Sequence, residues 1–309
     1  MIFSMQKHPI AAVVNFCTNE SRFIKACIEQ TSFFSPQIVI PVCDHFFDGT
    51  PENRSLLEKI YSAFPNCYFI EYPFIQKQIP SRIWKKIDAA HFWHSLSRLI
   101  GYSFLEEDID TVLFLDADEI PDGRRFAEWL ECSDYQYHTV MKMANYWYFR
   151  EPCHQSLRYE DSVVLAHRRA LSFDLLLKEE EREAIYSQLP CPKRRHVTGV
   201  DGQPMFHHYS WVRTKEEMLK KVMSWGHKGD RNWAEVVQKE FEQPFSGTDF
   251  VHGYTFKKID PLFDIRLEEV SFEGKGAPRV KRLSADDVLE LIHASKNSVW
   301  EWISRTFFR

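Results

Sequence analysis

Three acidic residues in the middle of the chain close an apolar run and are well suited to chemistry. The run at residues 111–115 favours a buried strand, and Asp116, Asp118 and Glu119 stand at its end. On a strand that continues straight, Asp116 and Asp118 project to one side and Glu119 to the other. Two close carboxylates repel each other unless a positive charge lies between them. A divalent cation that also binds a substrate phosphate would supply that charge, whereas solvated acids at a strand end are the plainer interpretation.

Two adjacent histidines, His207 and His208, form a second cluster suited to metal chemistry. Neighbouring residues of a strand point to opposite faces, so at most one of them can face the same site as the acidic residues. A histidine packed in the core is the plainer interpretation of either one. The next segment, residues 214–225, favours an amphipathic helix in which Lys221 could reach a phosphate as a point charge.

The elements that precede these residues must position them. Apolar runs typical of buried strands alternate with segments of helical spacing; the strand-like runs are 10–17, 37–42, 67–72 and 111–115, and the helical segments are 23–30, 51–64 and 84–105. The alternation predicts βαβ units, and therefore an α/β fold with a mostly parallel sheet flanked by helices. Polar loops follow three of the strands, at 18–21, 44–50 and 116–119, and are expected along one rim of that sheet.

The alternation weakens after residue 122. Further features are expected in this order: strands at 139–149 and 162–167, a charge run without assigned function at 178–183, a mobile connection at 190–204 and a last helix at 286–303. We therefore expect a main domain over residues 1–245, and a C-terminal helical extension over residues 246–309 that packs on it.

The composition narrows the class of protein. The 309 residues are 44% hydrophobic with a formal charge of -5, and no long basic run occurs, so nucleic acid is not expected as a partner. Seven cysteines without a CxxC pair predict reduced thiols in a cytoplasmic protein. No run approaches ~18 continuous apolar residues, the length that spans a membrane. Aromatic and arginine residues at 299–309 suggest peripheral contact with the inner membrane face, although a packed helix is the simpler interpretation.

The order and spacing of these motifs resemble the nucleotide-binding half of GT-A glycosyltransferases, most closely the family 2-like group. The resemblance rests on Asn19-Glu20, on Asp44-x-x-x-Asp48-Gly49-Thr50 and on Asp116-Ala117-Asp118, each after a strand. It implies a GT-A, Rossmann-like catalytic domain whose nucleotide-binding half covers about 1–125 and whose acceptor half covers about 126–245. It also implies a metal-dependent hexosyltransferase of glycan or glycolipid assembly, which moves a sugar from a nucleotide-diphosphate donor to a hydroxyl group of a glycan, lipid or protein.

The same resemblance implies roles for individual residues. The donor-binding candidates are Asn19, Glu20, Asp44, Asp48, Arg98, Asp116, Ala117 and Lys221. The candidate ligands of Mn²⁺ or Mg²⁺ are Asp116, Asp118 and His208, with His207 as the second choice of histidine. Arg98 is followed by Leu99, where relatives often carry Asn.

An inverting transferase also needs a carboxylate that removes the proton of the acceptor hydroxyl. By the resemblance, this base comes from a segment after the acidic motif, where Glu151, Glu160 and Asp161 are candidates. Glu160 and Asp161 are preferred. Spacing does not decide between them, and a retaining mechanism would not need such a base.

Other classes compete for the same residues. Haloacid-dehalogenase-like phosphatases also place an apolar strand before an Asp-x-Asp motif, but that motif usually opens their catalytic domain, whereas three strand–helix units precede Asp116 here. A nucleotidyltransferase would carry a Gly-rich first loop, and residues 15–21 contain no Gly. A non-catalytic module that binds a nucleotide sugar is the remaining alternative. Because neither GxGxxG nor a Walker-type GxxxxGK motif occurs, phosphate binding must come from a metal and cationic side chains.

Overall fold

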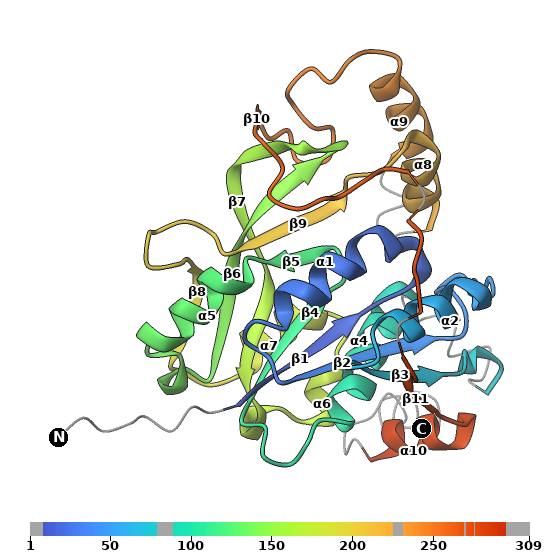
Figure 1. The fold of residues 1–309 in the computed structure, drawn as a ribbon, viewed down its shortest axis with the longest axis vertical. Coiled ribbons are helices and arrows are strands. Elements are labelled where there is room, and N and C mark those ends of the chain that lie inside the picture. Colours follow the sequence, from blue (N-terminus) through green and yellow to red (C-terminus); the bar gives the residue numbers. More distant parts are fainter. Residues whose placement is uncertain (1–8, 79–88, 225–230, 269, 275, 295–309) are drawn as a thin grey trace, which may run out of the picture.

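The structure, a computed structural model, describes residues 9–78, 89–224, 231–268, 270–274 and 276–294. These residues form one sheet with the strand order β11-β3-β2-β1-β4-β7-β6-β9-β5, and helices cover both of its faces (Figure 1). Two further strands lie beside this path, where β10 pairs with β7 and β8 with β6. The α/β class predicted from the alternating pattern is therefore confirmed, and the sheet is mixed.

The first half of the sheet is parallel and is built from the predicted apolar runs. Its strands are β1 (Ile10–Asn15), β2 (Gln37–Cys43), β3 (Tyr68–Tyr72), β4 (Thr111–Asp116) and, at the edge, β11 (Arg279–Arg282). Every residue of β1 is buried, as expected for a parallel strand covered on both faces. Asn15 pairs with Asp116, so the ends of β1 and β4 lie side by side.

Helices bury both faces of this parallel half. One face packs against α1 (Ser21–Thr31), α2 (Arg54–Ala63) and α5 (Gly123–Cys132). The other face packs against α4 (Ala89–Ser103), α6 (Phe173–Leu176), α7 (Glu181–Gln188) and α10 (Ala285–His293). Helix α4 lies so close to β1 that a Cβ atom on Gly101 would stand 2.4 Å from Cγ1 of Val13.

The second half of the sheet is mostly antiparallel. Beyond β4 it contains β7 (Glu151–His167), β6 (Val140–Phe149), β9 (Phe206–Trp211) and β5 (Glu119–Pro121), with β8 (Lys193–Val197) and β10 (Phe256–Lys258) as side strands. Helices α8 (Lys215–Ser224) and α9 (Trp233–Phe241) lie side by side and share an apolar cluster with Trp147 and Trp211 (Figure 1). Short 3-10 helices occupy Thr18–Glu20, Ile75–Gln78, Tyr135–Tyr137 and Arg168–Ala170.

Several boundaries differ from the predictions. The strand expected at 162–167 is only the end of β7, and the connection expected at 190–204 contains β8. The segment after residue 245 is not only helical, because it supplies β10 and β11 to the sheet. The last predicted helix, 286–303, is observed as α10 as far as His293. Its remainder from residue 295 on, and the predicted membrane contact at 299–309, lie outside the described residues. The domain division at residue 245 stays a prediction.

None of the helices in the described segments is long and apolar enough to cross a membrane.

Candidate active site

A cavity of about 380 Å³ lies where β1, β2 and β4 end. Residues of the three loops that follow these strands line it, together with His94 of α4, His208 and Ser210 of β9, and Lys220 and Lys221 of α8. The polar loops expected along one rim of the sheet therefore meet at a single hollow. Its volume is in the range of small-molecule sites.

Most of the residues predicted for the site line this cavity. They are Asn19, Glu20, Asp48, Asp116, Ala117, Asp118, His208 and Lys221. Two predicted donor-binding residues are not in the lining and act on their neighbours instead. Oδ1 of Asp44 accepts a hydrogen bond from the amide of Phe74 (2.8 Å), which holds the loop after β2, and Arg98 is buried behind Asp116.

Asp116 is neutralised within the protein. Its Oδ1 lies 3.1 Å from Nη2 of Arg98, and its Oδ2 lies 3.0 Å from Nη2 of Arg182. Burial opposes ionisation of this carboxyl group, but the charges of Arg182 and Arg98 outweigh burial and hold its pKa well below the usual range. Both oxygens of Asp116 therefore already have a cationic partner.

Asp118 is placed differently, although it stands two residues further on. Its ion-pair contacts are long, with Nε2 of His208 at 3.7 Å from Oδ1 and Nη2 of Arg213 at 4.0 Å from Oδ2. Burial, and then the negative charge of Glu20, raise the pKa of Asp118 well above its ordinary value. An added positive charge at this position would stabilise the carboxylate.

The two adjacent histidines lie on opposite faces of β9, as strand geometry predicts. His208 lines the cavity, and burial lowers its pKa, so its imidazole is neutral at pH 7 and able to bind a metal. His207 lies away from the cavity, with Nδ1 2.7 Å from the hydroxyl of Tyr148, and burial lowers its pKa to about 3. Its position does not support His207 as a metal ligand.

Arg182 is the main residue of this region that the sequence analysis missed. It comes from α7, in the charge run at 178–183 to which no function was assigned. Its guanidinium bridges two acids, because Nη2 lies 3.0 Å from both Oδ2 of Asp116 and Oε1 of Glu119. Glu119 is fully buried and its Oε2 accepts a hydrogen bond from the amide of Asp116 (2.9 Å). No local sequence signal identifies Arg182, since its partners lie far away along the chain.

Positive charge also reaches the cavity from α8. The ammonium of Lys221 donates a hydrogen bond to the hydroxyl of Ser210 (2.6 Å), and burial lowers its pKa. The ammonium of Lys220 donates to Oδ1 of Asn19 (3.0 Å) and stands 4.7 Å from the ring centre of Phe46. Both lysines line the cavity and can contribute to the binding of an anion.

The two predicted catalytic bases are not in the cavity lining. Burial raises the pKa of Glu160, and its Oε1 lies 3.4 Å from Nε2 of His252. Asp161 is engaged by Arg195, whose Nε and Nη2 donate to its two oxygens over 2.6 and 3.1 Å. Burial opposes ionisation of Asp161, but hydrogen bonding to Arg195 and the charge of Lys142 lower its pKa.

Several buried polar atoms in the cavity wall have no hydrogen-bond partner among the described residues. They are Oδ1 of Asn15, Oε2 of Glu20, Nδ1 of His94 and Nδ1 of His208. Buried polar groups are rarely left unpaired, so a concentration of them around one hollow indicates a place that solvent or a ligand fills.

The chemistry of the donor atoms fits a divalent cation at Asp118 and His208 better than at Asp116, which is already paired with two arginines. Asp116, Asp118 and His208 do not form a compact three-ligand cluster. In the part of the chain that the structure describes, the group of that kind is Glu151, Cys153 and His154, outside the cavity.

No protein-family model matches this sequence, and a search of curated proteins also gave no match. Among solved structures, the glycosyltransferase GlyE of Streptococcus pneumoniae matches with a TM-score of 0.38 and 11% identity, over 76% of this chain and 63% of that one. The catalytic domain of Drosophila β1,4-galactosyltransferase 7 matches with a TM-score of 0.34 and 12% identity, over 77% of this chain and 82% of that one.

A third solved structure, 4-diphosphocytidyl-2C-methyl-D-erythritol synthase of Anaerococcus prevotii, matches with a TM-score of 0.36 and 9% identity, over 64% of this chain and 89% of that one. Two of these three solved structures are described as glycosyltransferases. Similarity of this size concerns the general α/β arrangement, and it assigns no reaction, donor or metal to this chain.

Proposed function

We propose that this chain is a glycosyltransferase of the hexosyltransferase type, which moves a sugar from a nucleotide-diphosphate donor to a hydroxyl group of a glycan, lipid or protein with the help of Mn²⁺ or Mg²⁺. The charge arrangement of the cavity carries the proposal. The ion-pair contacts of Asp118 with His208 and Arg213 are long, and Lys220 and Lys221 line the same hollow. A nucleoside diphosphate with a bound divalent cation would place the cation beside Asp118 and His208, and the phosphate charge beside the two lysines.

Asp118 and His208 would hold the divalent cation, because a carboxylate oxygen and a neutral imidazole nitrogen both suit Mn²⁺. When bound, the cation would stabilise the negative charge that develops on the diphosphate as the bond to the sugar breaks. Asp116 would keep its arginine partners and use its remaining lone pairs to accept a hydrogen bond from the donor ribose.

Other residues of the cavity would bind the donor without a metal. Lys221 would donate a charged hydrogen bond to the diphosphate, since its ammonium group lies in the cavity wall. Asn19 and Asp48, from the loops after β1 and β2, would contact the nucleoside. Glu20 also lines the cavity, and its carboxylate forms an ion pair with Arg213 that offsets its negative charge.

Glu160 is the better of the two predicted bases if the reaction inverts the sugar. Its burial raises its pKa, which makes it a stronger proton acceptor, whereas both oxygens of Asp161 are occupied by Arg195. Because Glu160 stands outside the cavity lining, the acceptor hydroxyl would approach from the side of β7.

The phosphatase alternative is not favoured. A nucleophilic aspartate needs a free oxygen directed at the phosphorus atom, and both oxygens of Asp116 are held by arginines. A binding module without turnover would use the same cavity, and the experiment below separates it from an enzyme.

The test is incubation of the protein with a panel of nucleotide sugars, with and without Mn²⁺, and measurement of released nucleoside diphosphate. Release that depends on Mn²⁺ and is lost in D118N supports the proposal. The matched control is D264N, which changes an exposed aspartate outside the cavity lining and should leave release unchanged. Phosphate release from phosphate monoesters would instead indicate a phosphatase, and donor binding without turnover would indicate a module.

A further inference from the structure

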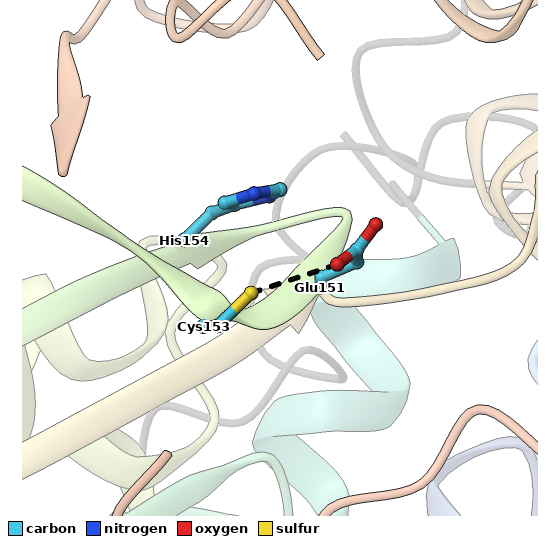
Figure 2. A group of neighbouring side chains, drawn as sticks. All are labelled: Glu151, Cys153 and His154. Atoms are coloured by element: carbon cyan, nitrogen blue, oxygen red, sulfur yellow. Dashed lines mark hydrogen bonds between the residues drawn. The ribbon is translucent and has the colours of Figure 1, made fainter. Parts of the chain in front are cut away.

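Three side chains of different chemistry converge near the start of β7. Glu151, Cys153 and His154 each offer one ligand atom, and these atoms lie within 4.8 Å of one another. Figure 2 shows Glu151 and Cys153 joined by a hydrogen bond close to the turn between β6 and β7, with His154 beside them on the same strand. Sγ of Cys153 lies 3.5 Å from Oε2 of Glu151. These three residues are separate from the cavity described above.

An irregularity in the pairing of β6 with β7 explains how neighbouring residues can converge. Phe149 pairs with Glu151, but Tyr148 pairs with Gln155, so residues 152–154 are extra residues opposite a single step of β6. Extra residues of this kind bend the strand and redirect its side chains. In a regular strand the side chains of residues 153 and 154 would point to opposite faces.

The bulge is held from its other edge by β10. The amide of Ile259 donates a hydrogen bond to the carbonyl of Cys153 (2.9 Å), and Lys258 pairs with His154 in the antiparallel ladder. The His154 ring also packs 4.7 Å from the ring of Phe245. Pairing with β10 therefore fixes the backbone of Cys153 and His154, and the ring of Phe245 packs on the His154 side chain.

The three side chains are available to an ion from solvent. Nδ1 of His154 is buried without a hydrogen-bond partner in the described segments. Glu151 is exposed, which leaves the group accessible to an ion from solvent.

We infer that Glu151, Cys153 and His154 bind one Zn²⁺ ion at the bulge of β7. A thiolate, an imidazole and a carboxylate are the donor set that zinc prefers, whereas Mg²⁺ and Mn²⁺ prefer oxygen ligands. The thiol of Cys153 releases its proton to solvent as the sulfur–zinc bond forms. Water completes the fourth position. This site is independent of the proposed transferase activity.

Cobalt(II) provides the test, because a thiolate bound to Co²⁺ absorbs in the near ultraviolet and a protonated thiol does not. The full chain, stripped with a chelator and kept reduced, is titrated with Co²⁺ and then with Zn²⁺. The wild type should gain the charge-transfer band at one equivalent and lose it to Zn²⁺. C153S should abolish the band, and H154Q should weaken Co²⁺ binding by roughly tenfold or more.

Two control variants test whether the absorption band belongs to the group of Glu151, Cys153 and His154. C132S removes an exposed thiol outside the three-residue group and should leave the band unchanged. D118N, which acts at the proposed donor cavity, should also leave it unchanged, so failure of the transferase proposal would not affect this one. The inference is overturned if the wild type shows no thiolate band, or if the band survives in C153S.

Discussion

Replacement of Arg182 by Gln should destabilise the protein strongly, because it leaves the buried carboxylate of Glu119 and the partly buried carboxylate of Asp116 without their shared partner. Nη2 of Arg182 lies 3.0 Å from an oxygen of Asp116 and 3.0 Å from an oxygen of Glu119. The side chain of Glu119 is 0% exposed and that of Arg182 is 12% exposed, so solvent cannot replace the lost charge. Removal of one partner from a buried ion pair typically costs about 3–5 kcal/mol, and we expect a loss of that size in the free energy of unfolding at neutral pH.

The effect of R182Q should depend on pH with a definite sign. In the wild type the charges of Arg182 and Arg98 outweigh burial and depress the pKa of Asp116. A depressed pKa stabilises the fold above the unfolded-state value of about 3.9, and that stability is lost as the pH falls through the folded-state pKa. In R182Q the pKa of Asp116 should rise, so protonation in acid removes part of the penalty. The difference in unfolding free energy should therefore be largest near neutral pH and shrink below about pH 4.

Urea unfolding, followed by tryptophan fluorescence at several pH values, measures this difference. The control is R195Q, which removes a half-exposed guanidinium from Asp161; it should cost less than R182Q, because Asp161 keeps Lys142 as a second partner at 3.1 Å. The double variant E119Q/R182Q should recover part of the loss, since it removes the charge of Glu119, whereas Asp116 keeps Arg98 as a partner. A cost of R182Q equal to that of R195Q, or a cost that grows on acidification, would refute the electrostatic explanation.

Three further predictions concern the cavity and the packing of the sheet. H208Q should weaken binding of Mn²⁺ by roughly tenfold or more, measured by calorimetry, and an unchanged affinity would exclude His208 as a ligand. K221M should weaken binding of a nucleoside diphosphate by about tenfold to a hundredfold, because a hydrogen bond to a charged group contributes about 1.5–3 kcal/mol; equal affinity would place the diphosphate elsewhere. G101A should lower the free energy of unfolding by about 1–3 kcal/mol, since its methyl group would stand 2.4 Å from Val13; an unchanged urea midpoint would contradict the contact between α4 and β1.

Patterns confined to a few neighbouring residues were enough to predict the parallel half of the fold. The observed ends of β1, β2 and β4 lie within two residues of the predicted ones, because a strand buried on both faces needs a continuous apolar run. The meeting of their polar loops at one cavity also follows from sequence, since parallel strands end at a common edge. Strand β7 was largely missed because its polar first part pairs with β6 and β10 and does not alternate.

Tertiary structure decided which aspartate of the acidic motif, Asp116 or Asp118, is already paired with arginines. The sequence alone placed Asp116 and Asp118 on one side of a strand end, where either could bind a cation. In the folded chain Arg98 from α4 and Arg182 from α7 neutralise Asp116, whereas the contacts of Asp118 with His208 and Arg213 are long. Sequence spacing describes neighbours along one strand, but a buried charge is set by the side chains that packing brings to it from distant helices.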